Sequence, residues 1–143
     1  MKKILLDTNA YARFLAGDEK VLARLAQADR VYMSVFVLGE LFAGFRAGAK
    51  EKHNRRIFES FLSKPGVSVL EATTETAEYF GMIKASLRKV ARPIPVNDVW
   101  IAAHVLEAGA VLVTYDSHFL AVPGLRIWDE IGEPASSGVK PTL

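Results

Sequence analysis

Short apolar segments alternate with amphipathic segments along most of the chain, and this alternation constrains the fold more than any other feature. The apolar segments are typical of buried strands and span residues 3–6, 30–34, 67–71, 111–114 and 125–128. The segments with helical spacing lie at residues 8–17, 19–28, 34–48, 50–64, 73–91 and 97–108. Strands that alternate with helices form parallel sheets, because parallel neighbours need a crossover connection. The sequence therefore predicts an α/β fold with three α/β/α layers and a mostly parallel central sheet.

The length and composition fit one domain. The chain has 143 residues, of which 50% are hydrophobic, enough for a sizeable core. We expect this domain to span residues 1–131, because no interior segment has the composition of a linker. Residues 132–143 read GEPASSGVKPTL and are rich in small, polar and proline residues. We expect them to form a flexible C-terminal tail.

The sequence also excludes several kinds of chemistry. It contains no cysteine, which rules out disulfides, thiolate catalysis and cysteine-ligated zinc. Asp7 interrupts the first apolar run too early for a signal peptide. No apolar stretch approaches the length of a membrane span. We therefore expect a cytoplasmic protein that does not bind membranes.

Three aspartates stand where predicted elements begin or end. Asp7 follows the strand at residues 3–6, Asp116 follows the strand at residues 111–114, and Asp98 opens the helix at residues 97–108. The carboxyl ends of parallel strands meet at one edge of a sheet, where ligand sites form. Each aspartate also has a structural interpretation. Asp7 and Asp98 could cap helices, and Asp116 could form an Asx-turn.

Glu40 lies inside the predicted helix at residues 34–48, where it has no cap to make. Its neighbours three and four positions away are Phe36, Val37, Ala43 and Gly44, which form an apolar stripe. A buried carboxylate is costly unless it is protonated, paired or bound to a metal. The alternative is that Glu40 lies at the rim of the stripe and reaches solvent.

Together the four acids predict a shared site. A divalent cation would stabilise carboxylates that lack matching cations, and an all-oxygen ligand set favours Mg²⁺ or Mn²⁺ over zinc. Such a site suits hydrolysis of phosphodiester bonds. Setting the four acids aside leaves 12 of the 16 acidic residues against 18 Lys and Arg residues. The rest of the surface could therefore attract a polyanion.

Four stretches of the chain resemble the PIN-domain nucleases, and most closely the VapC toxins of toxin–antitoxin pairs. They read LLDTNAY, SVFVLGELFAG, PVNDVWIAA and LVTYDSHF, in the order of the family. The resemblance implies a metal-dependent endoribonuclease that uses Mg²⁺ or Mn²⁺, forms a homodimer and binds a cognate antitoxin. It also implies that the catalytic and metal-binding residues are Asp7, Glu40, Asp98 and Asp116.

The resemblance assigns supporting roles to further residues. It implies that Thr8, Asn9 and Thr114 hold the acids by hydrogen bonds, and that the position of Asp116 is the most variable of the four. We interpret His104 as a packed core residue and His118 as a structural residue of a turn.

Two basic runs could follow an RNA backbone. One contains Lys50 and Arg55, and the other contains Lys84 and Arg88. The alternative for each run is a solvated helix face.

Two other functions remain open from the sequence. An aspartate-nucleophile phosphatase also places an aspartate after its first strand, but its motif has a second aspartate where this chain has Asn9. A non-catalytic PIN scaffold could bind RNA or protein, although such proteins usually lose acids that this chain keeps.

Overall fold

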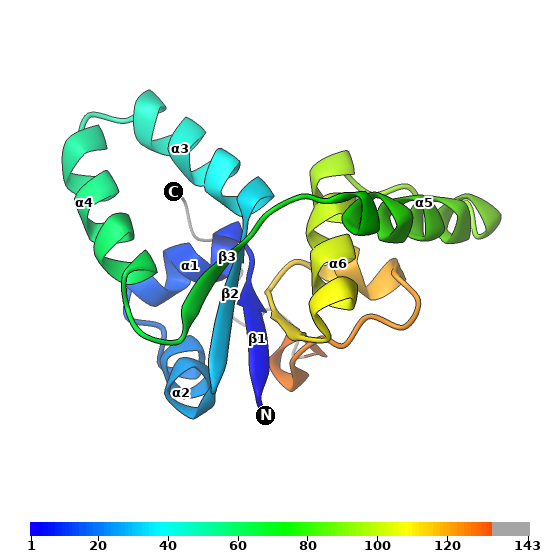
Figure 1. Ribbon diagram of the computed structural model, residues 1–143, viewed down its shortest axis with the longest axis horizontal. Coiled ribbons are helices and arrows are strands. Elements are labelled where there is room, and N and C mark those ends of the chain that lie inside the picture. Colours follow the sequence, from blue (N-terminus) through cyan, green and yellow to red (C-terminus); the bar gives the residue numbers. More distant parts are fainter. Residues whose placement is uncertain (133–143) are drawn as a thin grey trace.

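The computed structural model describes residues 1–132, and its central element is a four-stranded sheet (Figure 1). The strands are β1 (Lys3–Leu6), β2 (Arg30–Ser34), β3 (Val67–Leu70) and β4 (Val111–Val113), in the order β3-β2-β1-β4. Every pairing between them is parallel. The predicted parallel sheet is therefore confirmed.

Six α-helices cover the two faces of the sheet. They are α1 (Thr8–Leu15), α2 (Glu19–Gln27), α3 (Val35–Ala47), α4 (Glu51–Leu62), α5 (Thr74–Lys89) and α6 (Val96–Ala108). Figure 1 shows α1, α2 and α4 on one side of the sheet and α5 and α6 on the other. Two short 3₁₀ helices follow, η1 (Ser117–Ala121) and η2 (Asp129–Gly132). The predicted three-layer α/β/α fold is confirmed. Within residues 1–132, no helix is long and apolar enough to cross a membrane.

The strand order creates a switch point between β1 and β4. From β1 the chain proceeds outward to β2 and β3, and it then crosses back to place β4 on the other side of β1. In open α/β sheets, ligands bind beyond the carboxyl ends of the strands at such a point. The residues that follow β1 and β4 therefore occupy the position where this fold builds sites.

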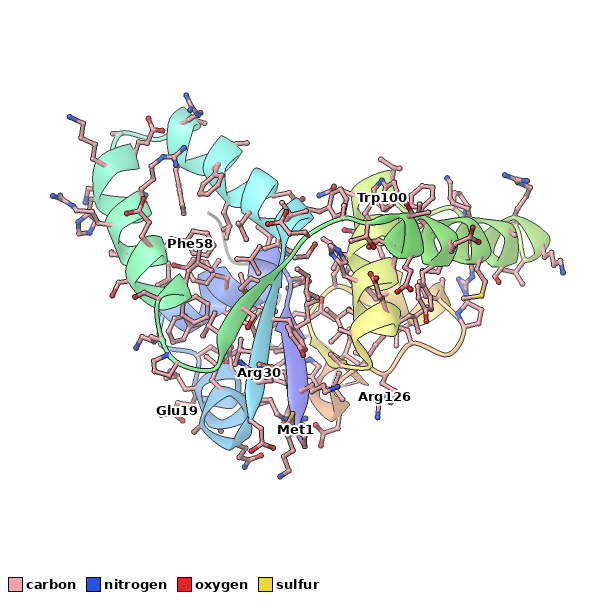
Figure 2. All side chains as sticks on the ribbon, in the orientation of Figure 1. Met1, Glu19, Arg30, Phe58, Trp100 and Arg126 are labelled. Atoms are coloured by element: carbon pink, nitrogen blue, oxygen red, sulfur yellow. The ribbon has the colours of Figure 1, made fainter. Side chains whose placement is uncertain are left out.

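Two aromatic clusters fix the helices that flank this edge. On one side, Tyr11 of α1 packs against Phe58 and Phe61 of α4, with ring centroids 5.0 and 5.4 Å apart. On the other side, Trp100 of α6 stacks on Phe80 of α5 at 4.0 Å and on Phe36 of α3 at 5.0 Å. Figure 2 marks the two clusters by Phe58 and Trp100. The second cluster ties α3 to α6.

Capping residues set the ends of several helices. Ser34 caps α3 by accepting a hydrogen bond from the Phe36 N–H, and Thr73 forms a capping box with Thr76 at the start of α5. Gly109 ends α6 in the left-handed region, with φ at 65°, a conformation that costs glycine little.

The predicted strand at residues 125–128 is wrong. Only Ile127 pairs with β4, as an isolated bridge to Leu112. The Leu125 N–H bonds back to the Val122 carbonyl, and η2 begins directly after Trp128. The extended stretch is therefore too short to form a ladder. The predicted flexible tail lies outside the described residues except for Gly132, which ends η2.

Candidate active site

Asp7 is a buried carboxylate at the carboxyl end of β1. Its residue is 4% exposed, and it caps α1, with Oδ1 accepting a hydrogen bond of 2.8 Å from the Ala10 N–H. Oδ2 accepts a hydrogen bond from the Thr114 hydroxyl. Burial raises the pKa of Asp7 to about 7, although these two hydrogen bonds oppose the rise. The charges of Asp116 and Asp98 contribute to this rise in pKa. Asp7 therefore caps α1, and burial also destabilises the ionised form of its carboxylate.

Thr114 connects the two aspartates that follow strands. Its side chain is fully buried, and its hydroxyl donates to Asp7 while accepting the Asp116 N–H at 2.9 Å. The Asp116 carboxylate in turn accepts the His118 N–H at 2.9 Å, so the expected Asx-turn is present. This chain of hydrogen bonds fixes the backbone after β4 relative to the end of β1.

Asp98 does not cap α6. The helix begins at Val96 with Pro95 at the cap position, and no side chain accepts a hydrogen bond from its first turn. Burial raises the pKa of Asp98 to about 6, and the charge of Asp116 adds to the rise. His118 lowers this pKa, and the charge of Glu40 raises it. The structural interpretation of Asp98 as a helix cap is therefore wrong, and its carboxylate faces the other acids.

His118 joins this cluster, and the sequence interpretation missed that position. Its Nδ1 atom lies 3.1 Å from Asp116 Oδ1 and 3.4 Å from Asp98 Oδ2. One donor atom from each of these three residues lies within 4.8 Å of the other two. The signal in the sequence was the spacing, because a histidine two residues after a strand-end aspartate can fold back on it in a tight turn.

Glu40 lies at the rim of the site. It is exposed on α3, as the rim interpretation expects, and Oε1 accepts a hydrogen bond of 2.7 Å from the Thr8 hydroxyl. Thr8 follows Asp7 directly, and the charge of Glu40 acts on Asp98. The structure therefore brings all four acids to one edge of the sheet. In residues 1–132, the Asn9 side chain makes no hydrogen bond to any of them.

The acids lack ordinary counter-charges. Across residues 1–132, none of the four forms an ion pair with lysine or arginine, and the only basic group at ion-pair distance is His118. Carboxylate oxygens with one imidazole nitrogen form a ligand set that fits a divalent cation. Asp98, Asp116 and His118 could hold such an ion, and Asp7 adjoins them.

The structure does not bring the two basic runs together. Lys50 is exposed at the start of α4, where Arg55 pairs with Glu51 at 3.2 Å and lies over the ring of Phe42. On α5, Lys84 and Arg88 are exposed. Figure 1 shows α4 and α5 on opposite sides of the molecule. The two runs therefore belong to separate surfaces of the molecule.

His104 is a core residue, as interpreted from the sequence. It is 1% exposed, with Nδ1 2.8 Å from Ser34 Oγ and Nε2 3.0 Å from the Glu71 carbonyl. A carbonyl only accepts, so Nε2 donates and Nδ1 accepts the serine proton. Since Ser34 caps α3, this histidine ties α6 to the helix that carries Glu40.

The sequence of the chain is similar to those of known proteins. Residues 4–125 match the PIN domain family. The chain is 33% identical to "Ribonuclease VapC2" of Haemophilus influenzae over 116 residues, which cover 80% of this chain and 86% of that protein. It is 31% identical to "tRNA(fMet)-specific endonuclease VapC" of Salmonella typhimurium over 132 residues, which cover 90% of this chain and 98% of that protein.

Solved structures include relatives of the same shape. The structure of DNA-bound VapBC from Salmonella typhimurium contains a chain that superposes with a TM-score of 0.79 at 30% identity. The superposition covers 90% of this chain and 98% of that one.

Proposed function

The chain belongs to the PIN-domain family and within it to the VapC ribonucleases, and we propose that it is a metal-dependent endoribonuclease, the toxin of a toxin–antitoxin pair. One observation carries the proposal. Asp7, Glu40, Asp98 and Asp116 meet at the switch point of the sheet without a lysine or arginine partner in residues 1–132. Such an arrangement lowers the free energy of unfolding when the acids are ionised, and perturbed acids of this kind mark a candidate functional site.

Asp98 and Asp116 are the residues that would hold Mg²⁺ or Mn²⁺. The bound ion would supply Lewis acidity and offset negative charge during hydrolysis of a phosphodiester bond. Asp7 would complete the ligand set from the buried side. Its carboxylate is kept in one orientation by the Ala10 N–H and the Thr114 hydroxyl. Fixed partners of this kind orient metal ligands and reduce the reorganisation needed when an ion binds.

Glu40 would act from the solvent side. It is the exposed member of the set, and the Thr8 hydroxyl donates a hydrogen bond to one of its oxygens. We propose that this carboxylate orients the attacking water through a hydrogen bond. Thr8 would then be a positioning residue for Glu40, as Thr114 is for Asp7. In the described part of the chain, no hydrogen bond from the Asn9 side chain to the acids supports its predicted role.

The substrate that we propose is RNA in single-stranded or loop form. Names of relatives that specify ribonuclease and tRNA endonuclease activity support this class. Exposed Lys50, Lys84 and Arg88 would contact phosphates on either side of the acids. Arg55 would contribute less, because Glu51 and Phe42 already engage its guanidinium group.

We also propose a cytoplasmic protein that forms a homodimer and is inhibited by a cognate antitoxin. Solved relatives that are VapBC complexes support the antitoxin. An arginine of the antitoxin would fit the unpaired acids, because guanidinium binds carboxylates in bidentate geometry.

The test is cleavage of RNA by the purified protein with Mg²⁺, with Mn²⁺ and with EDTA. We expect endonucleolytic products that need a divalent ion and are absent with Asp98→Asn. Cleavage that survives exhaustive chelation would contradict the proposal. Hydrolysis of phosphomonoesters alone would favour the phosphatase alternative, and RNA binding without cleavage would favour the scaffold alternative.

A further inference from the structure

Among the side chains that cluster at the site in residues 1–132, His118 is the only nitrogen donor, and the acidic residues of the proposed function do not account for it. Its Nδ1 atom faces Asp116 Oδ1 at 3.1 Å and Asp98 Oδ2 at 3.4 Å. The imidazole thus points at two carboxylates from different elements, one after β4 and one on α6. A histidine that only shaped its turn would need neither contact.

The spacing of these atoms matches ligands that share one ion. Adjacent ligands in an octahedral site with bonds of about 2.1 Å are separated by roughly 3.0 Å. The two distances from Nδ1 lie near that value, and the three donor atoms all lie within 4.8 Å of one another. An ion could therefore bind between them with small movements of the side chains.

The local backbone places His118 beside Asp116. The His118 N–H donates to Asp116 Oδ1, and the next residue, Phe119, is 1% exposed and anchors η1 in the core. The side chain of His118 is itself 53% exposed. Solvent and ions can therefore reach the imidazole.

We propose that His118 is a metal ligand and that it makes the centre select Mn²⁺ over Mg²⁺. This inference rests on the proposed function, since it concerns the ion of the same site. Mg²⁺ favours oxygen ligands and binds imidazole poorly, whereas first-row transition ions accept mixed oxygen and nitrogen ligand sets. An all-carboxylate version of this site would discriminate little between the two ions.

The experiment measures binding of Mn²⁺ by electron paramagnetic resonance and binding of Mg²⁺ by competition, at constant pH, for three proteins. These are the wild type, His118→Ala and the control His53→Ala, which removes another exposed histidine, on α4. We expect His118→Ala to weaken Mn²⁺ binding by about 10- to 100-fold and Mg²⁺ binding by less than about threefold. His53→Ala should change neither.

Pulsed resonance of bound Mn²⁺ gives a readout that does not depend on catalysis. We expect nitrogen-14 coupling from a bound imidazole in the wild type and in His53→Ala, and no such coupling in His118→Ala. Equal weakening of the two ions, or tighter binding of both in His118→Ala, would overturn the inference, because His118 would then act only as a counter-charge. Wild-type binding without nitrogen coupling would overturn the inference alone, whereas a wild type that binds no Mn²⁺ would also overturn the metal centre of the proposed function.

Discussion

Acidic residues outside and inside the candidate site have opposite surroundings. Outside the site, Asp29 accepts a hydrogen bond of 2.6 Å from the Lys2 N–H, and Asp129 pairs with Arg24 at 2.6 Å. Inside the site, Asp7 and Asp98 have no lysine or arginine partner within residues 1–132. The same residue type is therefore exposed and bonded to a nearby donor outside the site, and clustered and desolvated inside it.

This difference separates acids that serve the fold from acids that serve the proposed chemistry. Burial raises the pKa of Asp7 to about 7 and that of Asp98 to about 6, and neighbouring acids add to both. An acid whose pKa is raised by folding destabilises the folded state once it is ionised. Perturbed acids that gather at a switch point mark a candidate functional site. The comparison can be tested by changing one acid inside the site and one outside it.

The largest effect should be on activity. Asp98→Asn should lower the rate of RNA cleavage by at least about a thousandfold, because loss of a charged metal ligand removes several kcal/mol of transition-state stabilisation. The measurement is the single-turnover rate with saturating Mn²⁺.

The matched control for this activity is Asp129→Asn, outside the candidate site. It removes an acid that is paired and exposed, and it should leave the cleavage rate unchanged. A similar loss of rate in both variants would mean that acids inside and outside the site do not differ in function.

The next effect concerns stability and pH in EDTA. The pKa of Asp7 rises from 3.8 to about 7 on folding, so the penalty is absent below pH 4 and complete above pH 7. The free energy of unfolding should therefore fall by about 4 kcal/mol across this range from Asp7 alone. Burial lowers the pKa of His104 from its unfolded value of 6.5. Below pH 6.5 this residue therefore makes the free energy of unfolding rise with pH, which is opposite to the effect of Asp7.

Asp7 and His104 have opposite effects on how the free energy of unfolding changes with pH. The comparison of wild type with Asp7→Asn therefore isolates the contribution of Asp7. Urea unfolding at pH 5 and pH 8 should show that the variant loses less stability with rising pH than the wild type. Equal losses in the two proteins would mean that Asp7 titrates at its ordinary pKa.

The position of the acids could be predicted from the sequence to a large extent. Alternating strands and helices predict a parallel sheet, and the ends of parallel strands share an edge, so Asp7 and Asp116 had to lie near each other. Convergence of Asp98 and Glu40 on this edge needed the packing of α3 against α6 through Phe36 and Trp100. The local periodicity of the sequence cannot predict that contact between distant segments.

Other features depend on geometry that the sequence does not specify. The imidazole of His118 faces the acids only because η1 folds back from β4 toward α6. The sequence alone allows Asp98 to be a helix cap, whereas in the structure Pro95 occupies the cap position of α6. Glu40 lies in an apolar stretch, yet it is exposed, because α3 extends past the sheet edge and leaves that face uncovered.

A smaller effect should separate the destabilisation that the Asp98 charge causes from its proposed role in metal binding. Asp98→Asn should raise the free energy of unfolding in EDTA at pH 7 by about 1 kcal/mol, because one desolvated and repelling charge is removed and no helix cap is lost. Addition of Mn²⁺ should raise the melting temperature of the wild type more than that of the variant, since an ion that binds only the folded state stabilises it. Thermal melts with EDTA and with Mn²⁺ measure both quantities. A variant that is less stable in EDTA and has the same Mn²⁺ shift would make Asp98 a structural residue.

The smallest effect should come from the acid outside the candidate site. Asp129→Asn should lower the free energy of unfolding by no more than about 1 kcal/mol, because pairs between exposed side chains contribute little and the Asp129 side chain is 80% exposed. The guanidinium of Arg24 keeps its contact with the Trp128 ring, 5.9 Å from the ring centroid, so the variant loses charge without losing that packing. The loss should shrink further in about 0.5 M salt, where exposed charges are screened. The Mn²⁺ shift in melting temperature should equal that of the wild type. If Asp129→Asn instead altered that shift, an acid outside the candidate site would be coupled to the ion. The division between acids that stabilise the fold and acids that bind the metal would then be wrong.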